Sequence, residues 1–188
     1  MMKSKMNVKA ETISYSYVTL QNAAKYALET ALKSEEGRFF NSLSAMLYSA
    51  FSIEAYLNHL GKSEFQNWEK IERHKSPKQK LDMLVEKRGY RPDFSKRPFD
   101  TFDKIFNFRK LMVHGKTESV KLEEIQAREF GDKPELPRTL WEKSITSENA
   151  TIFVEDSGAM ILMLHPVFGY SSDPFFTEWK STWEAKPS

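Results

Sequence analysis

Apolar residues recur at helical spacing along most of the chain. The strict alternation of apolar and polar residues that is typical of strands is hard to find. The pattern predicts a helix from about Tyr17 to Lys33, and a longer helix from about Phe39 to Leu60 that ends at Gly61. The apolar face of the first helix consists of Leu20, Ala24, Ala27, Leu28 and Ala31.

The next helix has the clearest start signal in the sequence. Ser76 is a suitable N-cap, Pro77 suits the first turn, and Gln79 stands where a capping box needs a glutamine or glutamate. Gly89 is expected to end this helix. The prolines and glycine of the following segment, GYRPDFSKRP, indicate a loop.

Two more long helices are expected after this loop. The first extends from Phe99 to His114 and is closed by Gly115, and the second extends from Ser147 to Leu164, where Pro166 stops it. Between them, residues 117–146 contain helical pieces broken by the stretch GDKPELP.

These elements predict an all-α, up-and-down helical bundle of about five main helices with short extra helices. A length of 188 residues favours a single domain with a sizeable core. Residues 1–16 are expected to be flexible. Residues 166–188 form an aromatic tail that packs against the bundle or against a partner.

The composition excludes several classes of site. With no cysteine, the chain has no disulfide framework, no thiolate zinc site and no cysteine nucleophile. The four histidines show no metal-ligand spacing, and no glycine-rich phosphate loop is present, so neither a metal nor a cofactor is expected. No apolar run has the length of a signal peptide or a membrane span, which predicts a cytoplasmic protein without membrane contact.

Charge is distributed unevenly along the chain although the net charge is only +2. Residues 62–116 carry 15 Lys/Arg against 8 Asp/Glu, whereas residues 117–188 carry 7 against 13. A basic middle and an acidic end indicate a polyanion site, a partner chain or an internal electrostatic match.

Two charged residues interrupt apolar stripes. Glu54 lies three residues after Phe51 in the stripe of its helix, and Arg109 lies three residues after Phe106 in another helix. An unpaired buried carboxylate is costly, so we expect Glu54 and Arg109 to pair. The pair has two interpretations: a salt bridge that fixes helix packing, or part of a functional site.

His114 follows Arg109 by five residues, which on a helix is about 7.5 Å along the axis and about 140° around it. Histidine is an acid or base near neutral pH, and arginine offers permanent donors to phosphate oxygens. Together they supply the chemistry for cleaving RNA without a metal. One group assists attack by the 2′-hydroxyl, and the cation stabilises the charge on the phosphoryl oxygens.

The segment RKLMVH, from Arg109 to His114, resembles the arginine–four residues–histidine motif of the HEPN superfamily. The earlier segment AFSIEAYLN, from Ala50 to Asn58, resembles the long helix of that family, which often carries an acidic residue in an apolar setting. The family comprises helical-bundle proteins of prokaryotic toxin–antitoxin, abortive-infection and CRISPR-associated systems, and some eukaryotic RNA-processing factors. The resemblance implies a metal-independent endoribonuclease, a homodimer with a composite active site, and RNA or an antitoxin as partners.

Five other residues belong to the candidate site. Tyr56 and Asn58 are candidates for orienting the catalytic pair, although core packing is the commoner role of tyrosine. Lys110 stands where the family commonly has Asn, Asp or His, and lysine binds phosphate but accepts no hydrogen bond. Lys116 and His74 are candidate phosphate or RNA contacts, and the basic loop around His74 is otherwise a solvated surface.

The remaining two histidines, His59 and His165, stand near helix ends, where capping is the expected role. Two functions stay open. One is RNA cleavage by Arg109 and His114, with Glu54 orienting the arginine. The other is a non-catalytic helical module that binds a cognate protein or nucleic acid through its basic middle segment.

Overall fold

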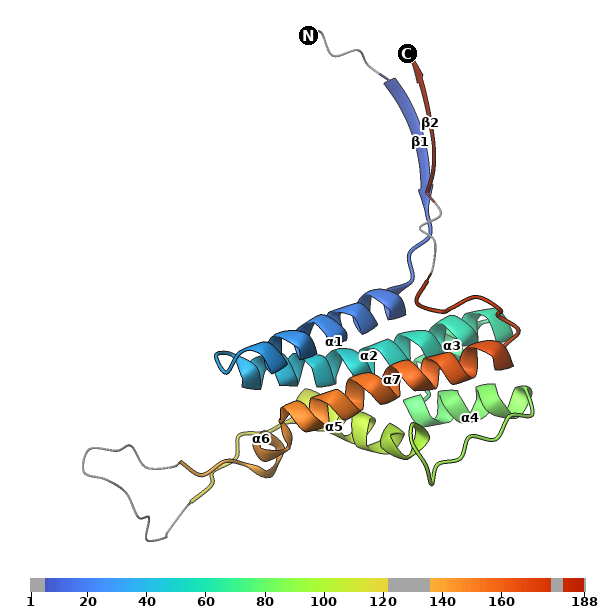
Figure 1. Cartoon of the computed structure of the whole chain (residues 1–188). Helices are drawn as coiled ribbons and strands as arrows, with labels where there is room; N and C mark the ends of the chain where they lie inside the picture. The colour runs from blue at the N-terminus through green and yellow to red at the C-terminus, as the bar shows by residue number, and fades with distance from the viewer. Residues whose placement is uncertain (1–5, 122–135, 177–180, 188) are drawn as a thin grey trace, which may run out of the picture.

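The computed structural model describes residues 6–121, 136–176 and 181–187, and it confirms an all-α bundle (Figure 1). The main helices are α1 (Ser16–Lys33), α2 (Arg38–Glu64), α4 (Pro77–Lys87), α5 (Phe102–His114) and α7 (Ser147–Val167). Short elements are α3 (Trp68–Glu72), α6 (Leu140–Ser144) and the 3-10 turn η1 (Phe99–Thr101). None of the described helices is long and apolar enough to cross a membrane.

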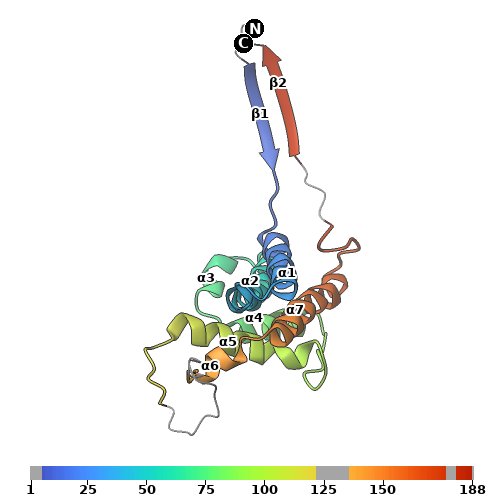
Figure 2. The same ribbon diagram turned by 60° about the vertical axis from the view of Figure 1, so that its left-hand side comes forward.

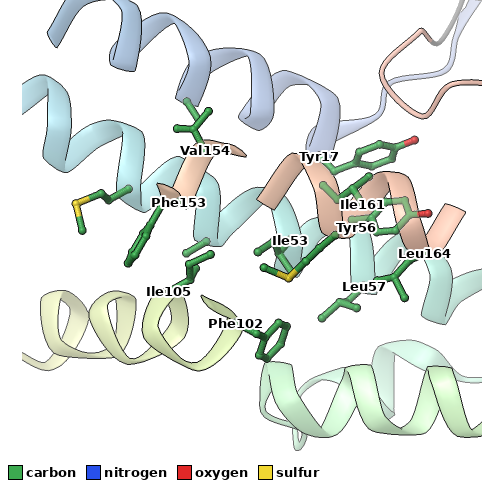
Figure 3. Close-up of a cluster of buried hydrophobic side chains, with 14 of the residues drawn as sticks. Tyr17, Ile53, Tyr56, Leu57, Phe102, Ile105, Phe153, Val154, Ile161 and Leu164 are labelled. Carbon is green, nitrogen blue, oxygen red and sulfur yellow. The ribbon is translucent and has the colours of Figure 1, made fainter. Parts of the chain in front are cut away.

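Helix α2 is the centre of the bundle. It packs against α1, α4, α5 and α7, and α1 also packs against α7. The core lies between these helices (Figure 3). Its buried side chains include Tyr17, Ile53, Tyr56, Leu57, Phe102, Ile105, Phe153, Val154, Ile161 and Leu164.

The predicted signals at the ends of α4 are confirmed. The Ser76 side chain accepts a hydrogen bond from the Gln79 backbone, and the Gln79 side chain accepts one from the Ser76 backbone. These two bonds satisfy backbone donors at the helix start. Gly89 adopts φ +64° directly after the helix, a conformation that glycine tolerates at no steric cost.

The prediction that Gly61 ends α2 is wrong, because the helix continues to Glu64. Gly61 is instead a packing position. A Cβ atom on Gly61 would lie 2.1 Å from the indole ring of Trp68, so only glycine lets the α3 tryptophan lie against α2. Likewise Pro166 does not stop α7 before it, since the helix includes this proline in its last turn and ends at Val167.

A two-stranded ribbon, which the sequence pattern did not predict, joins the two ends of the chain. Strand β1 (Met6–Thr12) pairs antiparallel with β2 (Ser181–Pro187). Residues 6–12 of the N-terminal segment that is expected to be flexible therefore form a strand. Two views show that the ribbon extends away from the helices (Figures 1 and 2).

The segments before α6 and after α7 agree only in part with the predictions made from the sequence. Of the helical pieces expected in residues 117–146, α6 is present, and residues 122–135 lie outside the described residues. In the aromatic tail, Phe168 is buried and Phe175 packs against the core, whereas Phe176 is exposed. Residues 177–180 and 188 also lie outside the described range.

Candidate functional site

A carboxylate with two cationic partners lies where α2, α4 and α5 meet. The Arg109 Nη2 atom is 3.2 Å from Glu54 Oε2, and Lys80 Nζ is 3.4 Å from Glu54 Oε1. The predicted ion pair between Glu54 and Arg109 is therefore present. Two cations surround one carboxylate, so this three-residue centre carries a net charge of +1.

Exposure differs sharply within the centre. The Arg109 side chain is 31% exposed and Glu54 is 22% exposed, whereas Lys80 is only 4% exposed. Glu54 neutralises the buried ammonium of Lys80 and holds one side of the Arg109 guanidinium. Part of the Arg109 side chain remains open to solvent, and a permanent cation there attracts anionic groups.

Sequence reasoning did not identify Lys80. The residue lies in the first turns of α4, and its neighbour Leu81 and the next-turn residue Leu84 are both fully buried. Because residues four apart share a helix face, the spacing from Lys80 to Leu84 placed this lysine on the apolar side. That spacing was the only available signal, since lysine near a helix start is usually solvated.

Asn58 follows Glu54 by one turn on the same face of α2 and is half-buried. Its Oδ1 atom and the Nε atom of Arg109 are both buried and form no hydrogen bond with a described residue. Buried polar atoms are normally paired. The contact with Glu54 thus satisfies only part of the hydrogen-bonding capacity of Arg109.

Tyr56 does not belong to this centre. Two residues beyond Glu54 on a helix is about 200° around the axis, so Tyr56 faces the opposite side of α2. Its side chain is fully buried, and its hydroxyl lies 2.9 Å from Nδ1 of His165 on α7. Tyr56 therefore contacts neither Arg109 nor His114, in contrast to the role expected for it.

His114 is the last residue of α5, and its side chain is exposed. Lys110 and Lys116 are exposed near the same helix end. Because Arg109 faces α2 while His114 lies five residues further along, the two side chains leave α5 in different directions. No hydrogen bond within the described part of the chain connects them.

His74 is exposed in the turn between α3 and α4. Its backbone N–H donates to the Ile71 carbonyl at 3.1 Å. The described contacts do not join its side chain to α5, so His74 stays a separate basic surface position.

The other two histidines lie among tyrosines, His59 half-buried and His165 buried, which the capping prediction missed. His59 contacts the rings of Tyr17, Tyr56 and Tyr170, and His165 stacks on Tyr170. Burial lowers the pKa of His59, and nearby His165 lowers it further. Burial also lowers the pKa of His165, although Asp173 opposes this shift.

The tyrosines of this cluster respond to burial in the opposite direction. Burial, with a smaller contribution from Tyr15 and Tyr170, raises the pKa of Tyr17 to about 12. Burial is also the main reason why the pKa of Tyr56 is raised. Both hydroxyls therefore stay protonated at neutral pH, and the Tyr56 hydroxyl remains available as a donor to His165.

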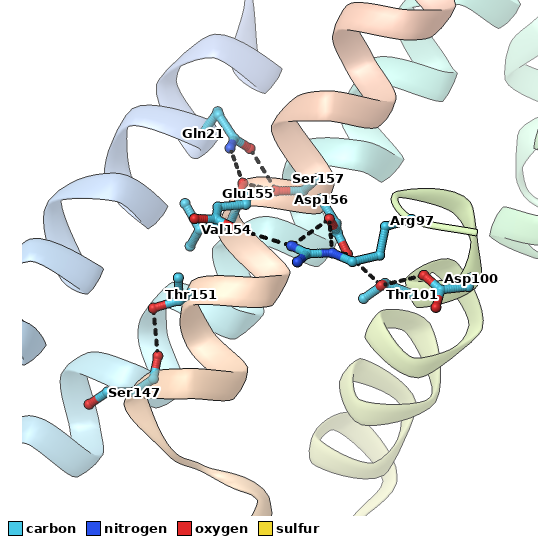
Figure 4. Close-up of polar contacts among 10 residues, drawn as sticks. All are labelled: Gln21, Arg97, Asp100, Thr101, Ser147, Thr151, Val154, Glu155, Asp156 and Ser157. Carbon is cyan, nitrogen blue, oxygen red and sulfur yellow. Dashed lines mark hydrogen bonds and ion pairs between the residues drawn. The ribbon is translucent and has the colours of Figure 1, made fainter.

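An ion pair between Arg97 and the buried carboxylate of Asp156 connects the segment before α5 to α7 (Figure 4). The Asp156 side chain is 4% exposed and accepts hydrogen bonds from Arg97 Nε at 2.9 and 3.0 Å. Thr101 in η1 donates a further hydrogen bond to the same carboxylate. This network positions the start of α5, the helix that carries Arg109, relative to the rest of the bundle.

A cavity of about 380 Å³ lies between α5, α6 and the first turns of α7. Most of its lining is apolar, and Lys104, Asn107 and Asn149 contribute polar groups. The other lining residues are Met46, Phe108, Leu111, Leu140, Trp141, Ser144 and Phe153.

Within the described residues, no group of three or more His, Asp or Glu side chains is arranged to hold a metal ion. Comparisons of this chain with models of protein families, with curated proteins and with solved structures find no match.

Proposed function

We propose that the chain is a metal-independent endoribonuclease in which Arg109 and His114 carry out the reaction. The observation that carries this proposal is the centre of Arg109, Glu54 and Lys80. It holds the guanidinium of the partly exposed Arg109 side chain against Glu54, and it carries a net charge of +1. The anionic group of RNA is the phosphodiester. We expect the basic residues of this part of the chain to bind it.

In the proposed reaction His114 takes the proton of a ribose 2′-hydroxyl, and the 2′-oxygen forms a bond to the adjacent phosphorus. The bond from phosphorus to the 5′-oxygen breaks, and that oxygen receives a proton from an imidazolium or from water. The products are a 2′,3′-cyclic phosphate and a 5′-hydroxyl. Arg109 stabilises the negative charge that develops on the phosphoryl oxygens.

The separation of Arg109 and His114 bears on how such a site is completed. The two residues are about 140° apart around the axis of α5. This separation favours a composite site, in which one chain provides the arginine and a second copy provides the histidine. Lys110 and Lys116 then add phosphate contacts beside His114. Asn58 has a buried side-chain oxygen without a hydrogen-bond partner among the described residues, whereas Tyr56 has only a structural role in this proposal.

The test is cleavage of labelled RNAs in EDTA by the wild type, His114→Ala and Arg109→Ala. We expect the wild type to produce ends with a 2′,3′-cyclic phosphate, and each variant to lose at least a hundredfold in rate. Tyr26→Ala changes an exposed residue of α1 outside the candidate site, and this control variant should keep the cleavage activity. Full activity of His114→Ala, or absence of cleavage by a folded wild type on several unrelated RNAs, would exclude the proposal.

The second candidate is a non-catalytic module that binds a cognate protein, such as an antitoxin. The cavity beside α5 favours it, because Leu111 and Leu140 at this cavity are 42% and 85% exposed. Large exposed apolar residues around a concavity are typical of interaction sites. This function would be supported if Leu111→Lys no longer bound a partner protein that the wild type binds, and if the wild type cleaved no RNA.

A further inference from the structure

The ribbon of β1 and β2 has little support from the rest of the molecule. It extends away from the helices, and the described residues provide no third strand (Figure 2). A two-stranded ribbon in water is marginally stable, and three or more strands are usually required. Each strand also has one edge whose backbone donors and acceptors lack strand partners, and such edges pair readily with other chains.

The sequence of β1 is self-complementary when two copies run antiparallel around Ala10. Lys9 of one copy then lies opposite Glu11 of the second copy, and Glu11 lies opposite Lys9 of the second copy. Val8 faces Thr12 in the same way, and Ala10 faces itself. Opposite charges directly across an antiparallel pair stabilise it, whereas like charges destabilise it.

We propose that the free edge of β1 pairs with β1 of a second copy of this chain. The two ribbons then form one four-stranded antiparallel sheet around a two-fold axis. The axis passes between the Ala10 residues of the two copies, and the two β1 strands lie in the centre with a β2 strand on each side. A two-fold interface needs a surface that complements itself, and the charges on β1 meet this condition.

The charges within one ribbon favour this arrangement further. The register pairs Lys9 with Glu184 on β2. In the four-stranded sheet, Lys9 lies between Glu184 of its own chain and Glu11 of the second copy. The edge of β2 is less suitable for pairing because it includes Pro187, which has no N–H to donate. This inference does not depend on RNA cleavage, since no residue of the Arg109 centre takes part.

The experiment is sedimentation velocity on the full chain over a wide concentration range, comparing the wild type with Glu11→Lys. Within the ribbon Glu11 pairs with Thr182, so the substitution leaves the Lys9–Glu184 pair intact. In the proposed dimer it places a lysine opposite Lys9 at two symmetric positions. We expect a wild-type dimer, and a rise in the dimer Kd on the order of tenfold in the variant.

Glu36→Lys is the matched control, because it makes the same charge change at an exposed position before α2. Its dimer Kd should equal that of the wild type. A wild type that stays monomeric at every concentration would overturn the proposal. A dimer that is unaffected by Glu11→Lys would overturn it as well, since pairing through the edge of β2 or a helical face predicts that result.

A charge swap supplies the decisive comparison. A second variant, Lys9→Glu with Glu184→Lys, keeps opposite charges inside its own ribbon but places a glutamate opposite Glu11 in its homodimer. Mixed with the Glu11→Lys chain, it meets opposite charges at both symmetric contacts. We expect a heterodimer with a lower Kd than either variant's homodimer, and a mixture without this preference would contradict the β1–β1 pairing.

Discussion

Lys80 Nζ lies 3.4 Å from the Glu54 carboxylate, and only 4% of the lysine side chain is exposed. Glu54 is therefore the counter-ion of a buried ammonium as well as the partner of Arg109. Loss of the carboxylate charge leaves the ammonium without compensation in a place where water solvates it poorly.

Glu54→Gln should lower the free energy of unfolding by about 3 kcal/mol, the lower end of the range for a broken buried ion pair, since Glu54 is partly exposed. Urea denaturation measures this. Lys80→Met is the matched comparison, because it removes the buried charge while Glu54 keeps Arg109, and it should cost less than Glu54→Gln. Equal stability of Glu54→Gln and the wild type would show that the ion pairs contribute little.

Arg109→Lys should separate packing from the proposed catalysis. Lysine preserves the charge next to Glu54, so the free energy of unfolding should change by less than about 1 kcal/mol. The planar array of donors is lost, and under the proposed function RNA cleavage should fall at least tenfold. A variant with normal cleavage would limit Arg109 to a structural role.

Tyr56→Phe should destabilise the bundle by about 1–3 kcal/mol, because it leaves the buried His165 Nδ1 without its hydrogen-bond partner. Chemical denaturation detects a change of this size. Tyr26→Phe removes the same hydroxyl from a residue that is 75% exposed and should have no effect. Equal effects of the two substitutions would mean that the buried hydrogen bond makes no net contribution to the free energy of unfolding.

Stability should fall as the pH is lowered from about 7.5 to 5.5. Because burial lowers the pKa values of His59 and His165 below the ordinary value of about 6.5, the unfolded chain binds protons more readily than the folded chain. The contribution of the two neutral histidines to stability is therefore complete above about pH 6.5 and is lost as the pH falls below this value. The slope is at most about 1.4 kcal/mol per pH unit for each histidine.

Denaturation at a series of pH values measures this slope. The double variant His59→Gln and His165→Gln should flatten it between pH 7.5 and 5.5. His74→Gln removes an exposed histidine and should leave the slope as in the wild type. A wild type whose stability is constant over this interval would contradict the effect of burial on these two groups.

Gly61→Ala should destabilise the protein although alanine is the better helix former by about 1 kcal/mol. The new methyl group would overlap the Trp68 ring, and forced repacking typically costs about 1–3 kcal/mol. Thermal unfolding of the single variants and of the double variant with Trp68→Ala tests the cause. In the Trp68→Ala background the same substitution should be neutral or stabilising.

The sequence predicted the parts of the fold and site that depend on local spacing. Helical periodicity identified the main helices, and capping chemistry identified both ends of α4. The Glu54–Arg109 pair was predictable because each residue interrupts an apolar stripe, and a buried charge requires a partner.

The features that were missed depend on contacts between distant parts of the chain. Lys80 resembled an ordinary solvated lysine until α4 was placed against α2. His59 and His165 stand near helix ends and resembled caps, but the packing of α2 against α7 places both among tyrosines, with His59 half-buried and His165 buried. The close contact between Trp68 and Gly61 could not be predicted from the sequence around Gly61 alone.

The ribbon joins nearly the whole length of the chain into one loop, which has a kinetic consequence. Closing so long a loop before the helices assemble costs considerable chain entropy. Once α1 and α7 pack together, the bundle holds the beginnings of both connecting segments close to each other. The β1–β2 contacts have the largest sequence separation in the described structure, so we expect them to form last during folding. In native-state hydrogen exchange, we expect the amides of β1 to lose protection before those of α2.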